Sequence, residues 1–219
     1  MFIGHIAVGL AAKRLTPKTS LGTLLISVQC LDLVWPVMLL LGLEHVRIDP
    51  GNTVVTPLDF YDYPITHSLL GAAAWSLVLA GIYWLARRER RAALVIGAGV
   101  LSHWILDAIS HRPDLLLIPG GQIKVGLGLW NCLPATLLVE GSLFLAGIAL
   151  FLRTSEARDG IGRYGFGILM AVFLALYLGA LFGPPPPNPQ ALAWVSLATW
   201  LFVPLLYWID RHRQTIQTQ

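Results

Sequence analysis

The sequence predicts an all-α fold, a polytopic membrane helical bundle of about six transmembrane helices plus an N-terminal half-helix. Of the 219 residues, 56% are hydrophobic and only 12% are charged, whereas about 25% are charged in ordinary soluble domains. The mean hydropathy is +0.68. Long apolar runs recur along the chain and are separated by short polar segments. We therefore expect a single membrane domain over residues 1–219.

Apolar runs long enough to cross a bilayer, about 20 residues each, cover 21–43, 66–86, 92–110, 133–152, 164–183 and 191–209. Residues 2–15 are apolar but too short to span, so we expect a half-helix that rises into the bundle. Pro36 removes a backbone hydrogen bond to the carbonyl of Asp32 and predicts a kink there. Glycines and a proline in 112–132 predict a folded loop in place of a span.

The basic residues fall into four clusters between the apolar runs. They are Lys13, Arg14 and Lys18; Arg87, Arg88, Arg90 and Arg91; Arg153, Arg158 and Arg163; and Arg211 and Arg213. They alternate with the acidic loop 44–65 and the uncharged loop 184–189. The positive-inside rule then predicts a multi-pass protein of the cell inner (plasma) membrane whose basic loops and termini are cytoplasmic. This pattern accounts for the net charge of +3, so nucleic acid is not an expected partner.

The two cysteines, Cys30 and Cys132, lie in or beside apolar runs. We expect two buried free thiols and no disulfide framework. Gln29 stands where a small residue would precede a lipoprotein cysteine. No cleavable signal peptide is expected either, because the first long apolar run is too long and lacks a small-residue cleavage site.

The segment 102–111 places three ionisable residues, His103, Asp107 and His111, at intervals of four residues inside an apolar run. Such residues share one face of an α-helix. Ionisable groups at membrane depth are costly and usually functional. This face therefore predicts a metal site or a proton site.

Other polar residues are expected at the same depth. At 1.5 Å per residue, Asp32 and His103 each lie roughly 18 Å above the basic end of their spans. His67 lies at the outer end of the second span, after Thr66, which is a good N-cap residue. The helix N-terminus disfavours a protonated histidine, so the imidazole should stay neutral. Glu140 lies about two turns into the fourth span and needs a partner.

His5 would stand about 12 Å above Lys13 on the half-helix, as the lowest member of the cluster. The remaining ionisable residues near span ends are expected to be solvated or surface charges. They are His45, His212, Asp59, Asp62, Arg112 and Asp114.

Four motifs occur in a definite order within residues 1–140: Gly4-His5-x-x-x-Gly9, Leu31-Asp32-Leu33, Thr66-His67-Ser68 and Ser102-His103-x-x-x-Asp107. The order resembles the prokaryotic membrane-bound hydrolases that are predicted to be metal-dependent, a family that includes the LexA-regulated inner-membrane hydrolase. It is also similar to the ligand order of the zinc-dependent phospholipase C and nuclease superfamily.

The second likeness implies a first metal held by Asp32, His67, His103 and Asp107. It further implies that Asp107 bridges to a second metal with His5, and that His111 and Glu140 serve another. The resemblance thus implies one to three ions, with Asp107, Asp32 and Glu140 as the candidate catalytic carboxylates. Residues 141–219 are expected only to complete the bundle.

Mixed imidazole and carboxylate ligands suit Zn²⁺ first, with Mn²⁺ or Fe²⁺ as alternatives. The resulting expectation is a membrane-embedded phosphoesterase, similar to phospholipase C, in which metal-activated water attacks a phosphoester or other ester of a lipid-like substrate. The partners are then the lipid bilayer and that substrate, and the sequence defines no oligomeric state. A metal-ion or proton-coupled transporter and a non-enzymatic structural metal site are the alternatives.

Overall fold

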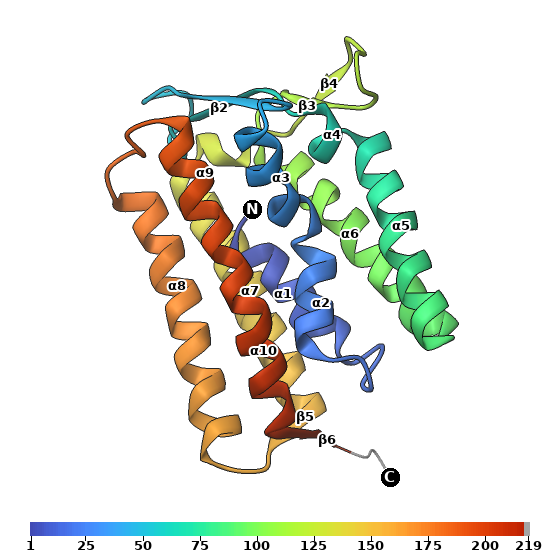
Figure 1. Ribbon diagram of the computed structural model, residues 1–219. Coiled ribbons are helices and arrows are strands. Elements are labelled where there is room, and N and C mark those ends of the chain that lie inside the picture. Colours follow the sequence, from blue (N-terminus) through green and yellow to red (C-terminus); the bar gives the residue numbers. More distant parts are fainter. Residues whose placement is uncertain (217–219) are drawn as a thin grey trace.

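The computed structural model describes residues 1–216, and it is a bundle of helices capped by short strands at both ends (Figure 1). Within these residues, five helices are long and apolar enough to cross a membrane, or six if one bent pair counts as a span. The predicted all-α polytopic bundle is therefore confirmed.

The spans follow the predicted apolar runs closely. The continuous helices are α5 (Leu69–Arg87), α6 (Arg90–Ser110) and α7 (Leu133–Thr154). Two further spans are composite. The short π-helix η2 (Ile161–Gly165) leads into α8 (Phe166–Phe182). The helix α9 (Pro189–Leu197) continues through the 3₁₀-helix η3 (Ala198–Leu201) into α10 (Phe202–Arg211).

The first span is broken at Gln29, seven residues before Pro36. The helices α2 (Leu21–Val28) and α3 (Cys30–Leu40) meet at an angle of 59° across Gln29. Pro36 lies inside α3, which continues past it to Leu40. The observed bend therefore precedes Asp32, whereas the kink predicted at Pro36 would fall within the continuous helix α3.

The expected half-helix is α1 (Ile3–Ala12), which starts inside the bundle (Figure 1). It packs mainly against α7, α2 and α6. The approach to α7 depends on Gly147, where a Cβ atom would stand only 2.6 Å from the Ala7 carbonyl oxygen. A small residue thus lets two backbones meet and brings the start of α1 to mid-bundle.

One end of the bundle carries two hairpins and a short helix. Strand β1 (His45–Ile48) pairs with β2 (Leu58–Asp62), and β3 (Leu115–Leu116) pairs with β4 (Lys124–Val125), both antiparallel. The helix α4 (Pro64–His67) and the turn η1 (Leu129–Asn131) complete this hairpin end. The segment 112–132 is thus a folded loop, as predicted.

The opposite end carries the basic clusters. The α1–α2 connection, the α5–α6 turn and the pair of strands β5 (Ser155–Ala157) and β6 (Arg213–Thr215) lie there together (Figure 1). We call it the basic end. Of the two free cysteines, Cys30 is buried as expected, but Cys132 at the hairpin end is exposed, so that expectation was wrong.

Candidate metal centre

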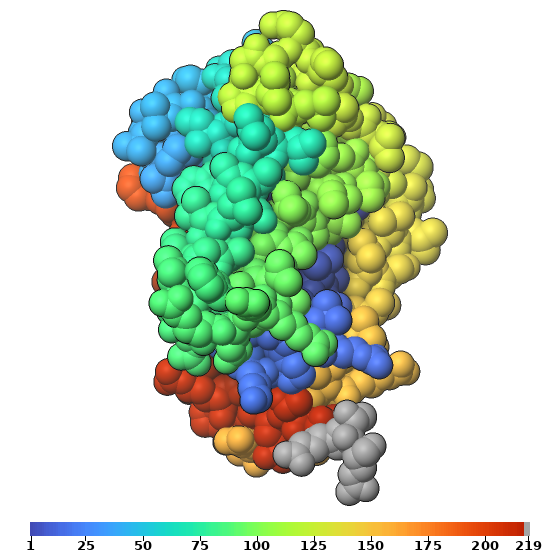
Figure 2. Space-filling model, turned by 90° about the vertical axis from the view of Figure 1, so that its right-hand side faces the viewer, coloured from blue at the N-terminus to red at the C-terminus, as the bar shows by residue number. Residues whose placement is uncertain are grey.

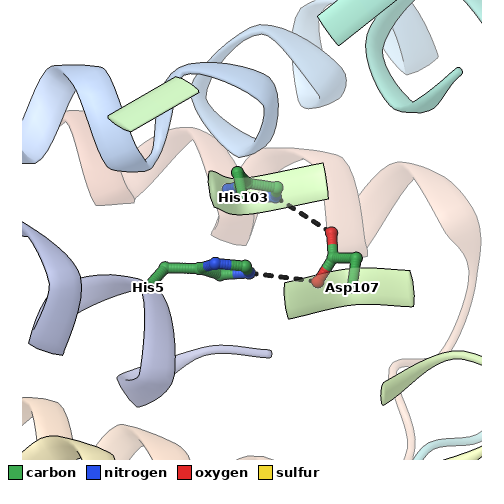
Figure 3. A group of neighbouring side chains, drawn as sticks. All are labelled: His5, His103 and Asp107. Carbon is green, nitrogen blue, oxygen red and sulfur yellow. Dashed lines mark hydrogen bonds and ion pairs between the residues drawn. The ribbon is translucent and has the colours of Figure 1, made fainter. Parts of the chain in front are cut away.

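The motif residues of the first half of the chain meet inside the bundle near its hairpin end. Helix α6 contributes His103 and Asp107, α1 contributes His5, α3 contributes Asp32, and α4 contributes His67. Figure 3 shows His5, His103 and Asp107, with both imidazoles turned toward the carboxylate. Two overlapping groups of three side chains could each hold a metal ion.

The first group is Asp32, His67 and His103. Asp32 Oδ1 lies 3.5 Å from His67 Nε2 and 3.6 Å from His103 Nε2. A tetrahedral ion with bonds of 2.0–2.1 Å has ligand atoms about 3.3–3.4 Å apart. Both nitrogen-to-oxygen distances are close to that separation, and all three donor atoms lie within 4.8 Å of one another.

The tautomer of His103 is fixed by a backbone carbonyl. Its Nδ1 lies 2.7 Å from the Val28 oxygen, which can only accept, so Nδ1 carries the proton. In the neutral ring Nε2 then presents a lone pair; among residues 1–216 it forms no hydrogen bond, although Asp107 Oδ2 lies 3.1 Å away. The side chain is fully buried. A buried lone pair that faces carboxylate oxygens requires a cation or a proton between them.

The acceptor for His103 comes from the helix break. Val28 is the last residue of α2, and the final carbonyls of a helix have no partner within it. The bend at Gln29 thus exposes a backbone oxygen toward α6. An outer partner of this kind, which fixes the ligand tautomer, is typical of metal-binding histidines.

The tautomer of His67 is fixed by a relay. The Thr66 hydroxyl donates to Glu44 Oε2 at 2.7 Å, so its oxygen accepts from His67 Nδ1, also at 2.7 Å. His67 Nε2 therefore presents a lone pair as well. In these tautomers, the Nε2 atoms of both histidines in the first group could serve as metal ligands.

Sequence reasoning missed Glu44, which it counted among loop charges. Only 1% of this residue is exposed, and its Oε1 accepts from the backbone N–H groups of Ile65 and Thr66. The sequence signal was an acidic residue upstream of Pro64-Ile65-Thr66, since carboxylates favour helix N-termini.

The expected capping role of Thr66 was wrong. Ser68 caps α5 by accepting from the Gly71 N–H at 3.0 Å. His67 instead closes the separate four-residue helix α4. Thr66 is therefore free to connect Glu44 to His67.

The second group is His5, His103 and Asp107. Asp107 Oδ1 lies 3.1 Å from His5 Nε2 and accepts from the Met1 amino group at 2.6 Å. Asp107 Oδ2 lies 3.1 Å from His103 Nε2 and 3.7 Å from His67 Nε2. The rings of His5 and His103 stack with centroids 3.7 Å apart. Because Nδ1 of His103 is committed to Val28, both groups depend on the same His103 Nε2.

His111 lies outside both groups. It is the C-cap of α6 with extended backbone angles, so the helical face that we expected to reach His111 ends at Ser110. Its Nδ1 lies 3.0 Å from Asp114 Oδ1, whereas its Nε2 is 3.9 Å from Asp107 Oδ1.

Asp114 is buried, contrary to the expectation of a surface charge. Its Oδ1 also accepts from the Tyr63 hydroxyl at 2.7 Å. Burial, and next the Asp114 carboxylate, raise the pKa of Tyr63 well above its usual value. Tyr63 therefore stays a proton donor that holds Asp114 beside His111.

Several other charges are placed by simple pairs. Asp59 is also buried and pairs with Arg112 and Arg47. His45 and His212 are partly exposed and pair with Asp62 and Asp159, respectively. The latter two histidines lie away from the cluster, as expected.

Glu140 is buried on α7 but also lies outside both groups. Its Oε2 accepts from the backbone N–H of Phe2 at 3.0 Å, which fixes the start of α1. The structure thus brings together five of the seven predicted ligands and gives Glu140 and His111 other partners.

Exposure differs sharply within the first group. The Asp32 side chain is 37% exposed, against 5% for His67 and 0% for His103. The group is therefore open on the Asp32 side, next to the bend, and closed elsewhere.

Comparison with known proteins identifies a family for this chain. Residues 1–184 match the family model described as YdjM inner membrane protein. No curated protein matches the chain. No solved structure matches it either.

Proposed function

The chain belongs to the YdjM inner membrane protein family, and we propose that it is a membrane-embedded metal-dependent hydrolase acting on a phosphoester or other ester of a lipid-like substrate. One observation carries the proposal. The Nε2 lone pairs of His67 and His103 converge on Asp32 Oδ1 at 3.5 and 3.6 Å, with both Nδ1 protons already committed.

Asp32, His67 and His103 would hold the ion. Two imidazoles and one carboxylate form a three-residue set of the kind found at catalytic zinc sites, where a fourth position stays open. Zn²⁺ suits this set best, and Mn²⁺ or Fe²⁺ are alternatives. When bound, such an ion lowers the pKa of a water ligand to about 7 and polarises the substrate oxygen.

Asp107 would accept the proton of the attacking water. Its Oδ2 stands beside both ligand nitrogens, at 3.1 Å from His103 and 3.7 Å from His67. Its Oδ1 is held separately by His5 and the Met1 amino group. One oxygen thus orients the carboxylate and the other faces the reacting centre, as proton transfer in general base catalysis requires.

The position of the site supports a lipid-like substrate. The ligands lie in apolar helices near the hairpin end, and the open side of the group at Asp32 lies on the bent first span. A substrate that brings an ester to this depth must itself be at home in the bilayer.

The first test is metal content of detergent-purified protein by elemental mass spectrometry. We expect about one equivalent of zinc, manganese or iron, because the two groups share one His103 nitrogen. His67→Ala should lose most of it, whereas His45→Ala, an imidazole outside the cluster, should retain it.

The same preparations should hydrolyse phospholipids or a model phosphodiester, and chelation should stop the reaction until metal is restored. Bound metal without hydrolysis of any such ester would overturn the proposed activity. Metal uptake into proteoliposomes that depends on His103 would replace it with transport, and unfolding on chelation without activity would indicate a structural ion.

A further inference from the structure

A second site lies at the basic end, away from the metal centre. A crevice of about 600 Å³ opens there between α2, α5, α6 and α10. Figure 2 faces the α5–α6 side, where the segment that follows α1 (blue) and the C-terminal helix (red) meet toward the lower end. None of the metal-centre residues lines this crevice.

The walls of the crevice are largely apolar. Ile26 of α2, Leu79 and Ile82 of α5, and Ile96 of α6 form its sides. Helix α5 packs mainly on α6, and α6 also packs on α2, so the crevice lies between α5 on one side and α2 and α10 on the other. A flexible hydrocarbon chain matches an apolar crevice that opens from inside a membrane bundle.

The mouth of the crevice is positively charged. Lys18, Arg87 and Arg211 line it and are exposed. Within residues 1–216, none of the three forms an ion pair with a carboxylate, so their charges remain available for a ligand.

Among the described residues 1–216, Asp210 is the only acidic residue that lines the crevice, and its charge is already neutralised. Its carboxylate oxygens lie 2.8 and 2.9 Å from the Lys13 ammonium, and Oδ2 also accepts from the Leu21 N–H. The mouth therefore presents three cations and no free carboxylate.

Hydroxyl groups complete the polar rim. The Tyr207 hydroxyl lies 2.6 Å from Thr23 Oγ1, and the Tyr83 hydroxyl lies 3.3 Å from Thr19 Oγ1. Tyrosines of this kind, with apolar rings and polar tips, suit the boundary between hydrocarbon and headgroups. The lining of the crevice thus combines apolar walls, several hydroxyl groups and three cationic side chains.

We propose that this crevice binds an anionic phospholipid, with its acyl chain against the apolar walls and its headgroup phosphate between Lys18, Arg87 and Arg211. Basic pockets between transmembrane helices are suited to such headgroups. The proposal does not depend on hydrolysis at the metal centre, because the two sites share no residue.

Native mass spectrometry of the full chain in detergent tests the proposal with phosphatidylglycerol and phosphatidylcholine of identical acyl chains. We expect retained phosphatidylglycerol adducts and far weaker phosphatidylcholine adducts. In K18Q/R87Q/R211Q, phosphatidylglycerol binding should fall roughly a hundred-fold, since each of the three basic residues contributes about five-fold in affinity for an anionic lipid.

The matched control is R14Q/R90Q/R153Q, which removes three exposed charges from the same end but none from the crevice. It should bind phosphatidylglycerol like the parent. Ala86→Phe fills the crevice without changing charge and should also weaken binding. Inorganic phosphate should not compete, because it lacks an acyl chain.

Equal retention of the two lipids, equal loss in both triple variants, or unchanged binding in Ala86→Phe would each overturn the proposal. Competition by inorganic phosphate would reassign the mouth to free phosphate. A dimer displaced by lipid would reassign the crevice to a second copy of the chain. Thermal unfolding of each variant in detergent would exclude loss of fold as the cause.

Discussion

His103 is the residue through which the metal centre is organised. One ring nitrogen is committed to the Val28 carbonyl, and the other faces both Asp32 and Asp107. The ring also stacks on His5. A single imidazole therefore links the bent first span, the half-helix and α6.

Asp107→Asn tests whether Asp107 accepts a proton or binds the metal. We expect this variant to keep its metal, because Asp32, His67 and His103 are unchanged, but to lose hydrolysis by about 10²- to 10⁴-fold. Metal content and ester hydrolysis on one preparation provide the readout. Loss of the metal would instead show that Asp107 is a ligand.

Glu44→Gln tests the relay to His67. The amide oxygen can still accept from the backbone N–H groups, but the NH2 group then faces the Thr66 hydroxyl and cannot accept from it. The hydroxyl therefore no longer fixes the tautomer and orientation of the His67 imidazole. Changes of this kind lower metal affinity by roughly 10- to 100-fold. Competition with a chromophoric chelator measures it, and Asp62→Asn, at a half-exposed loop carboxylate, should leave affinity unchanged.

At the level of helix packing, the approach of α1 to α7 is the clearest case. Gly147 has no room for a Cβ, because Ala7 backbone atoms lie 2.6–2.7 Å from that position. Gly141, on the same helix, has nothing within 4 Å of the corresponding position. The two glycines differ only in what faces them.

Gly147→Ala should therefore destabilise the protein by about 1–3 kcal/mol through overpacking against α1. Gly141→Ala should be neutral or stabilising by up to about 1 kcal/mol, because alanine favours helix over glycine. Thermal unfolding in detergent compares them. Equal effects would contradict the close contact between α1 and α7.

The spans could be predicted because a bilayer demands apolar runs of a minimum length. The pairing of His103 with Asp107 could also be predicted, because residues four apart lie on one face of a helix. Sequence periodicity failed at His111, where the helix ends before Arg112-Pro113; the residue before a proline avoids helical angles, so that signal was available. The sequence did not predict the bend at Gln29, because the contact that the bend allows, between the Val28 carbonyl and His103, joins residues that are far apart in the sequence.

The whole molecule has two chemically different ends. The cationic clusters all lie at one end, and the hairpins lie at the other (Figure 1). The positive-inside rule predicts that the basic end is cytoplasmic. The metal centre, near the hairpin end, would then lie toward the periplasmic side of the inner membrane.

Native Cys132, exposed at the hairpin end, reports this orientation. A membrane-impermeant maleimide should label it in cells with a permeabilised outer membrane and an intact inner membrane. C132S/R158C, which moves the thiol to the basic end, should react only after the inner membrane is opened. Labelling in the reverse order would invert the predicted topology.

The bend at Gln29 has a consequence for how an ion could leave the candidate metal centre. The group that fixes His103 is a backbone oxygen, which no side-chain substitution removes. Only a change in the path of the chain can withdraw it, and straightening of α2 and α3 would return the Val28 carbonyl to helical bonding. If the site holds an ion, its rate of exchange should then vary with the angle between α2 and α3.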